Sequence, residues 1–155
     1  MKKNKTNATQ LISALNDKGA TCVVPNGNSM WPFIKNHKQT VVIEKLKGDL
    51  ELLDVILFKR EDGSLVLHRL IDFKDNLLTV CGDSQLMPER IKTDSVIGIM
   101  TGFYKGKKLV SSRNPKYLKK VRRWYKRKNY RKFRIKIYFL VQRIFNKFKR
   151  EKEDV

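Results

Sequence analysis

Short apolar runs dominate the middle of the chain and are separated by polar turn sequences. Six such runs lie between residues 20 and 104: "TCVVP", "TVVIEKL", "DVILFKR", "SLVLHRLIDF", "LLTVCG" and "SVIGIMTGFY". Runs of β-branched residues bounded by "KGD", "EDG" and "KDN" are typical of strands joined by tight turns. Because no helical pattern interrupts them, they predict a mainly β fold, a folded antiparallel sheet or partial barrel.

Helical patterns flank this region at both ends. Residues 8–18 place apolar side chains on one face before Gly19, a residue suited to ending a helix: Leu11, Ile12 and Leu15. After Pro115 a second helical pattern begins, and "YRKFRIKIYFLVQRIFNKFKR" is amphipathic, with Lys and Arg mostly off its apolar side. We therefore expect an N-terminal helix over 1–19, one domain over 20–104 and a basic helical tail over 105–155.

Charge separates the tail from the rest of the chain. Residues 101–155 contain 21 Lys and Arg against three acidic residues, whereas residues 1–100 contain 14 against 12. A tail of this kind favours polyanions. We expect residues 113–150 to meet an anionic membrane surface, with aromatic side chains in an interfacial belt: Trp124, Tyr125, Tyr130, Phe133 and Tyr138. Nucleic acid is the alternative partner, and it rests on charge alone.

Several classes of protein lack support in the sequence. Cys22 and Cys81 form neither a disulfide framework nor a zinc motif, so we expect no metal and no cofactor. The basic start of the chain does not reach an apolar signal sequence, and no run of about 20 apolar residues could span a bilayer. We expect a cytoplasmic protein that is peripheral at the membrane rather than integral.

One segment carries candidate chemistry, "GNSMWP" at residues 27–32. It places the hydroxyl of Ser29 between a glycine and a proline. Further along, "VLHRLI" contains His68, and "VCGDSQ" contains Asp83 in a turn. A serine hydroxyl is a poor nucleophile without a base, and a histidine is mostly neutral at pH 7 and can serve as one. A carboxylate such as Asp83 could hold the imidazole in one tautomer, and Asp94 is its rival for this role.

These three segments resemble the signal peptidase and self-cleaving SOS-repressor superfamily of serine proteases over residues 20–102. The match to "G-x-S-M-x-P" implies that Ser29 is the nucleophile, and the histidine in "VLHRLI" is similar to the base of the Ser–His signal peptidases. The "GD" turn implies a third role for Asp83. Asp54 departs from the family pattern, because "LLD" stands where a "GD" is usual.

The same segment suggests how a substrate would be bound. A tetrahedral oxyanion needs hydrogen-bond donors, for which the backbone N–H of Ser29 and the side chain of Asn28 are candidates. Gly27 would let a peptide backbone approach closely, Pro32 would stiffen the turn, and Met30 would form core or pocket wall. The resemblance implies cleavage of an extended signal or leader peptide that is bound as an added strand.

Two alternatives remain open. The chain could keep the peptidase fold without activity and use its basic tail to bind membrane or nucleic acid. It could also be a conventional signal peptidase whose anchor lies in the tail or in a partner subunit. The repressor mode of self-cleavage is not expected, because only 28 residues precede Ser29 and they contain no helix-turn-helix pattern.

Overall fold

The computed structural model describes the backbone of residues 2–153 and the side chains of residues 8–147. Contacts divide the chain into two compact units, residues 1–119 and 120–155. The tail predicted over 105–155 includes a strand and the start of a helix that belong to the first unit. The side chains of residues 148–150, at the end of the predicted membrane-binding segment, lie outside the described residues.

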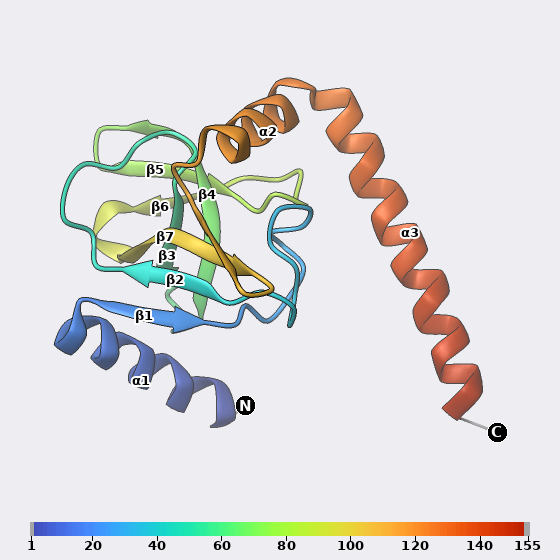
Figure 1. Ribbon diagram of the computed structural model, residues 1–155, viewed down its shortest axis with the longest axis horizontal. Helices are drawn as coiled ribbons and strands as arrows, with labels where there is room; N and C mark the ends of the chain where they lie inside the picture. Colours follow the sequence, from blue (N-terminus) through green and yellow to red (C-terminus); the bar gives the residue numbers. More distant parts are fainter. Residues whose placement is uncertain (1, 154–155) are drawn as a thin grey trace. The chain divides into compact units, whose positions relative to one another are not determined.

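The first unit contains an eight-stranded antiparallel sheet (Figure 1). Its strands are β1 (Ala20–Val23), β2 (Val41–Glu44), β3 (Val55–Lys59), β4 (Leu65–Lys74), β5 (Leu77–Cys81), β6 (Glu89–Lys92), β7 (Val96–Lys105) and β8 (Lys108–Ser111). A 3₁₀ turn, Thr93–Ser95, precedes β7. The hydrogen-bonded order is β1-β2-β7-β3-β4-β5-β6, and β8 also pairs with β7.

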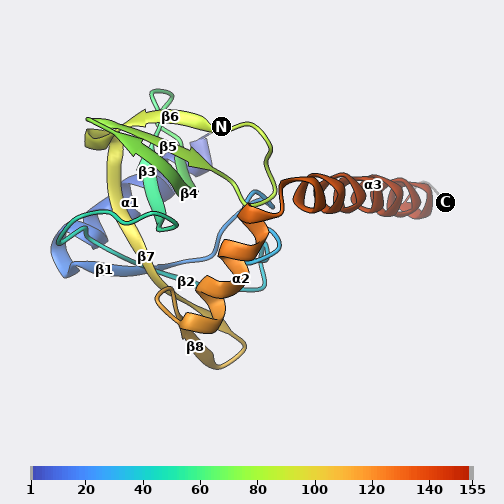
Figure 2. The ribbon, with the colours of Figure 1, turned by 90° about the horizontal axis from the view of Figure 1, so that it is seen from above.

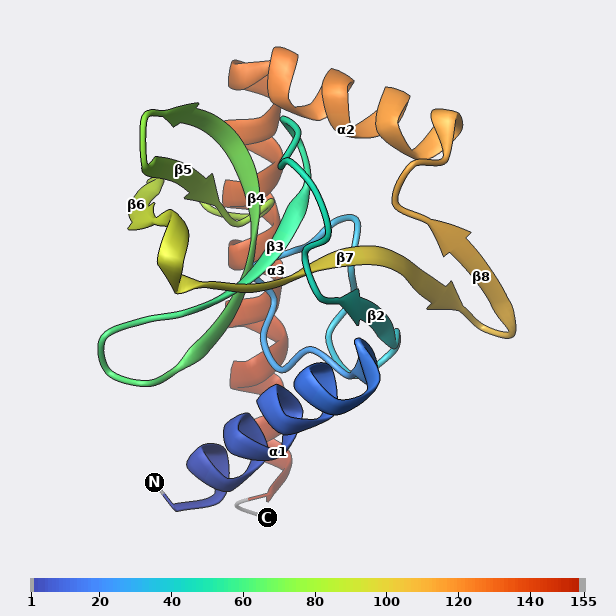
Figure 3. The same ribbon diagram turned by 90° about the vertical axis from the view of Figure 1, so that its left-hand side faces the viewer.

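Long strand β7 connects the two halves of the sheet. Its residues 99–103 pair with β2 and its residues 96–99 pair with β3, so it joins β1 and β2 to the β3–β6 group (Figure 2). Its last residues form a hairpin with β8 (Figure 3). The predicted hairpin turn at Asp62-Gly63 is confirmed, because β3 and β4 pair on either side of it.

Helices account for much more of the chain than a mainly β fold implies. Helix α1 (Lys2–Lys18) lies along the β1 edge of the sheet, and α2 (Pro115–Lys126) and α3 (Lys128–Glu153) follow the last strand. The described chain is therefore mixed α/β, and the class predicted from the strand patterns is too narrow. No helix among residues 2–153 is long and apolar enough to cross a membrane.

The interior of the first unit follows from alternation along the strands. Successive residues of a strand point to opposite faces, so in β2 the alternate residues Val41 and Ile43 are buried, whereas the central strand β3 is buried at four consecutive residues, 55–58. One buried cluster joins β3, β4 and β5: Ile56, Phe58, Leu70, Val80 and Leu78. Leu15 of α1 is also buried, as the apolar face predicted for that helix requires.

Candidate active site

An open cavity of about 690 Å³ lies in the first unit. Its walls come from α1, from the segment after β1 and from the β3–β4 hairpin. Ser29 and His68 both line it, although they are distant in sequence. The candidate nucleophile and the candidate base therefore share one solvent-accessible space.

Ser29 lies in a compact turn. The Asn28 carbonyl accepts a hydrogen bond from the Trp31 N–H at 3.0 Å, and the Met30 carbonyl accepts one from the Ile34 N–H at 2.9 Å. Gly27 has a φ of 118°, a conformation that L-residues with side chains rarely adopt. These features leave Ser29 half-buried at the cavity wall, between an exposed glycine and the buried Met30.

The turn after β5 is hydrogen-bonded to this serine segment. The Ser84 N–H donates to the Ser29 carbonyl at 2.8 Å, and Ser84 Oγ donates to the Asn28 carbonyl at 2.7 Å. Gly82 packs so closely that an added Cβ would lie 2.8 Å from the Ser29 carbonyl oxygen. The "GNSMWP" and "VCGDSQ" segments, which are distant in sequence, therefore pack directly against each other.

His68 and Arg69 are adjacent on β4 and serve opposite faces of the sheet. Because side chains alternate along a strand, His68 lines the cavity while Arg69 enters the interior on the other side. His68 is 2% exposed and Arg69 is fully buried. The His-Arg pair thus supplies one residue to the cavity and one to the scaffold behind it.

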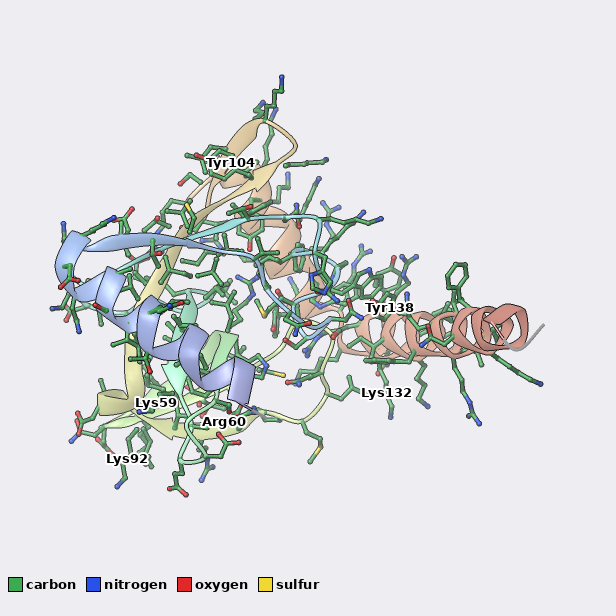
Figure 4. All side chains as sticks on the ribbon, turned by 90° about the horizontal axis from the view of Figure 1, so that it is seen from below. Lys59, Arg60, Lys92, Tyr104, Lys132 and Tyr138 are labelled. Carbon is green, nitrogen blue, oxygen red and sulfur yellow. The ribbon has the colours of Figure 1, made fainter. Side chains whose placement is uncertain are left out.

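The carboxylate beside His68 is that of Glu89 on β6. Glu89 Oε1 lies 2.7 Å from His68 Nδ1, within ion-pair distance, although the ring N–H is not aligned for a good hydrogen bond. Arg60, which extends from the end of β3 (Figure 4), donates two hydrogen bonds to Glu89, from Nε at 3.0 Å and from Nη2 at 2.8 Å. Two cationic or potentially cationic groups therefore hold one carboxylate in place.

The surroundings set opposite protonation preferences for this pair. Burial lowers the pKa of His68 below 6.5, and the charge of Glu89 and its proximity only partly offset this effect. Burial opposes ionisation of Glu89, but its hydrogen bonds from Arg60 and its closeness to His68 give a net lowering of the Glu89 pKa. At pH 7 the site therefore holds a neutral imidazole beside an ionised carboxylate.

Asp83 lies in a buried ion pair with Arg69. Its two oxygens accept hydrogen bonds from Arg69 Nε at 2.8 Å and Nη2 at 2.7 Å, and both residues are fully buried. Arg69 also donates to the Leu53 carbonyl at 2.8 Å and to the Tyr117 hydroxyl at 3.0 Å. The orienting role of Asp83 toward His68 stays a prediction, and Glu89 is the carboxylate within 3 Å of the ring.

The remaining predicted residues divide between the cavity and other places. Gly27, Asn28 and Met30 line the cavity, whereas Pro32, joined to Trp31 by a cis peptide bond, is absent from its described wall. Asp94 is exposed in the 3₁₀ turn. Asp94 has no contact with His68 among the described residues, so the structure does not support Asp94 as the carboxylate that orients the imidazole.

Sequence reasoning missed Glu89, Arg60 and Tyr117. Glu89 opens a four-residue strand of mixed charge, "ERIK", and Arg60 lies in a polar turn. Neither position differs from an ordinary surface residue in sequence. Only the pairing of β5 with β6, which places Glu89 opposite Val80, gives it a role.

No group of three or more His, Cys, Asp and Glu side chains in the described part of the chain could hold a metal ion. Comparison with protein-family models and with curated proteins finds no match to this chain. The residues that line the cavity are therefore the basis for assigning a function.

Proposed function

We propose that this protein is a serine endopeptidase resembling the signal peptidase and SOS-repressor superfamily, with Ser29 as nucleophile and His68 as general base. The observation that carries the proposal is that both residues line one open cavity, where His68 has a carboxylate 2.7 Å from Nδ1. A nucleophile, a base and a group that orients the base form the minimal set for acyl transfer.

The protonation states suit this assignment. An ionised Glu89 at Nδ1 favours the tautomer with its proton on that nitrogen. Nε2 is then the basic nitrogen that accepts the proton from Ser29 Oγ. Because burial lowers the pKa of His68, the ring is neutral and competent at pH 7.

The reaction follows from these roles. Ser29 Oγ attacks the scissile carbonyl, a C–O bond forms, and the serine proton moves to His68. His68 then gives that proton to the leaving amine as the peptide C–N bond breaks. The same imidazole then takes a proton from a water molecule, which attacks the acyl carbon. As the ester C–Oγ bond breaks, the proton passes from His68 to Ser29 Oγ and the carboxylic acid product leaves. The Ser29 N–H and the Asn28 side chain are the proposed donors to the oxyanion.

The proposed substrate is an extended peptide, of the signal or leader type. The cavity is open to solvent, and its wall includes apolar side chains of the β3–β4 hairpin, Leu57, Leu65 and Leu67. We propose that an extended peptide lies in this cavity and presents side chains to the apolar wall. We assign the fold to the same superfamily on the grounds that the serine segment follows an edge strand and the histidine strand pairs with β3.

The test uses full-length protein and two readouts. A diverse peptide library, analysed by mass spectrometry, reports cleavage, and a fluorophosphonate probe reports an activated serine. Ser29→Ala and His68→Ala should each abolish both signals. Ser64→Ala is the matched control, because Ser64 lines the same cavity in the β3–β4 turn, and it should retain both signals.

Two outcomes would overturn the proposal. Cleavage that survives in Ser29→Ala would remove the nucleophile. A folded wild-type protein that neither cleaves the library nor reacts with the probe would favour the inactive alternative.

A further inference from the structure

A row of large apolar side chains is exposed along α3, within the second unit. Its members recur at intervals of three and four residues, which places them on one face of the helix: Tyr130, Phe133, Ile137, Leu140, Val141 and Ile144. Each is at least 40% exposed, and Phe133 is 60% exposed. We call this set the α3 apolar face. Within the second unit its first member, Tyr130, has ring contacts with Trp124 at 6.3 Å and with Arg134 at 5.9 Å, whereas the members from Phe133 onward are exposed.

Basic side chains occupy another side of the same helix. Lys128, Lys132, Lys136 and Arg143 recur at intervals of four and seven and are all exposed. Lys132 and Tyr138 project from different sides of α3 (Figure 4). Over its full length α3 contains ten Lys and Arg against two Glu. The helix therefore combines an uncovered apolar face with a strong positive charge.

We propose that α3 binds the surface of an anionic lipid bilayer, with the α3 apolar face inserted among the headgroups and its basic residues at the phosphates. A helix with these two faces lies in the plane of a membrane interface, and its affinity increases with buried apolar area and with anionic lipid. No described helix has the composition to span a bilayer, so α3 binds parallel to the surface. The proposal is independent of the peptidase activity.

Two other occupants fit the helix less well. A second copy of α3 would cover the apolar face, but it would bring two strongly basic helices together at considerable electrostatic cost. Nucleic acid would satisfy the positive charge and leave the apolar face in water. The surface of an anionic bilayer can bury the α3 apolar face and also neutralise the positive charge of the helix.

Not every aromatic of the predicted interfacial belt can take part. Trp124 of α2 is buried, and its ring packs edge-on against that of Tyr130 at a centroid distance of 6.3 Å. Arg131 stacks on the Tyr125 ring at 4.4 Å. Trp124 is therefore unavailable to lipid, and the residues of the predicted belt that lie on the α3 apolar face are Tyr130 and Phe133.

The experiment measures binding of full-length protein to vesicles by flotation. Vesicles of phosphatidylcholine alone are compared with vesicles containing 30% phosphatidylglycerol, at low and high salt. We expect binding to the anionic vesicles that weakens with salt. Phe133→Glu and Ile144→Glu should each weaken it by at least about tenfold. Phe139→Glu is the matched control, because the exposed fraction of Phe139, 50%, lies between those of Ile144 and Phe133, and Phe139 is off the α3 apolar face.

Other results of this experiment would overturn the proposal or identify a different occupant of α3. Equal losses in Phe133→Glu and Phe139→Glu would overturn the assignment of the inserted face, provided that circular dichroism shows equal helix content. Duplex DNA that competes with the vesicles and still binds Phe133→Glu would identify nucleic acid as the occupant. A wild-type dimer that dissociates in Phe133→Glu, seen by sedimentation, would identify a second copy instead. Absence of binding to anionic vesicles would also overturn the proposal.

Discussion

Glu89 reaches His68 from across an intervening strand. The two residues lie on β6 and β4, which are separated by β5 in the sheet, yet Glu89 Oε1 is 2.7 Å from His68 Nδ1. Arg60 donates hydrogen bonds to both oxygens of this carboxylate. The orientation of the imidazole therefore depends on three strands and one hairpin turn, and on no local sequence motif.

Replacing Glu89 tests its role directly. Glu89→Gln keeps the size of the side chain but removes the negative charge at Nδ1. In the proposed peptidase we expect kcat to fall by about 100-fold or more, with a smaller effect on KM. Steady-state cleavage kinetics measure this change. Asp94→Asn is the control and should leave kcat within about twofold; a larger loss there would restore Asp94 as the orienting carboxylate.

The pKa of His68 predicts how activity depends on pH. Because burial lowers this pKa below 6.5, kcat/KM should stay constant from pH 8 to below pH 6.5 and fall only at lower pH. Loss of the Glu89 charge removes an interaction that raises the pKa, so Glu89→Gln should move the acidic limb to still lower pH. An acidic limb above pH 6.5 in the wild type would contradict a His68 pKa that burial lowers.

The same pKa has a consequence for stability. Below about pH 6.5 the unfolded chain binds a proton at His68 that the folded chain does not bind. The His68 contribution to the free energy of unfolding should therefore decrease as pH falls from 7.5 toward the folded pKa. Urea unfolding at several pH values, compared with His68→Gln, isolates this contribution. An equal pH dependence in both proteins would contradict it.

The buried pair of Arg69 and Asp83 should be essential to folding stability. Removing one charge leaves the other buried without its partner, so Asp83→Asn or Arg69→Met should lower the free energy of unfolding by about 3–5 kcal/mol. The double substitution Arg69→Met with Asp83→Asn should cost clearly less than the sum of the two single ones. Chemical denaturation of all four proteins measures the coupling, and simple additivity would show that the two charges act independently.

The contact between Gly82 and Ser29 can be tested with alanine. A Cβ at position 82 would lie 2.8 Å from the Ser29 carbonyl oxygen, so Gly82→Ala should destabilise the fold by about 1–3 kcal/mol and displace the serine segment. Reaction with the fluorophosphonate probe should fall accordingly. Gly48→Ala is the control, since nothing lies within 4 Å of its added Cβ. Equal stability of the two variants would indicate that the β5 turn adapts freely.

Much of the sheet could be predicted from the sequence, because six of its strands are apolar runs that alternate with turn signals. The two that were missed, β6 and β8, have four residues each; three residues of β6 are charged, and β8 has only two adjacent apolar residues, Leu109 and Val110. They are held by pairing with β5 and β7 and not by burial of their own side chains. Strands of this kind carry no periodic apolar signal.

The candidate site was predictable only where a motif marked it. Ser29 and His68 could be named because each lies in a recognisable segment, and the structure places both at one cavity. The partner of His68 depends on strand order and register, which the sequence does not state. Asp83 could be named because it lies in a Gly-Asp turn. In the structure its two oxygens accept hydrogen bonds from Arg69, the residue that follows His68.

Tyr117 determines how much of the basic C-terminal region, residues 105–155, can be deleted without loss of interior contacts. Its hydroxyl accepts a hydrogen bond from Arg69, and its ring packs against those of Phe33 and Phe103 at centroid distances of 5.9 and 5.3 Å. A truncation at residue 104, where the composition changes, would take away part of the interior beside β4, the strand that contains His68 and Arg69. Shortened forms that test the proposed peptidase activity without the proposed lipid-binding helix should therefore retain the first turns of α2.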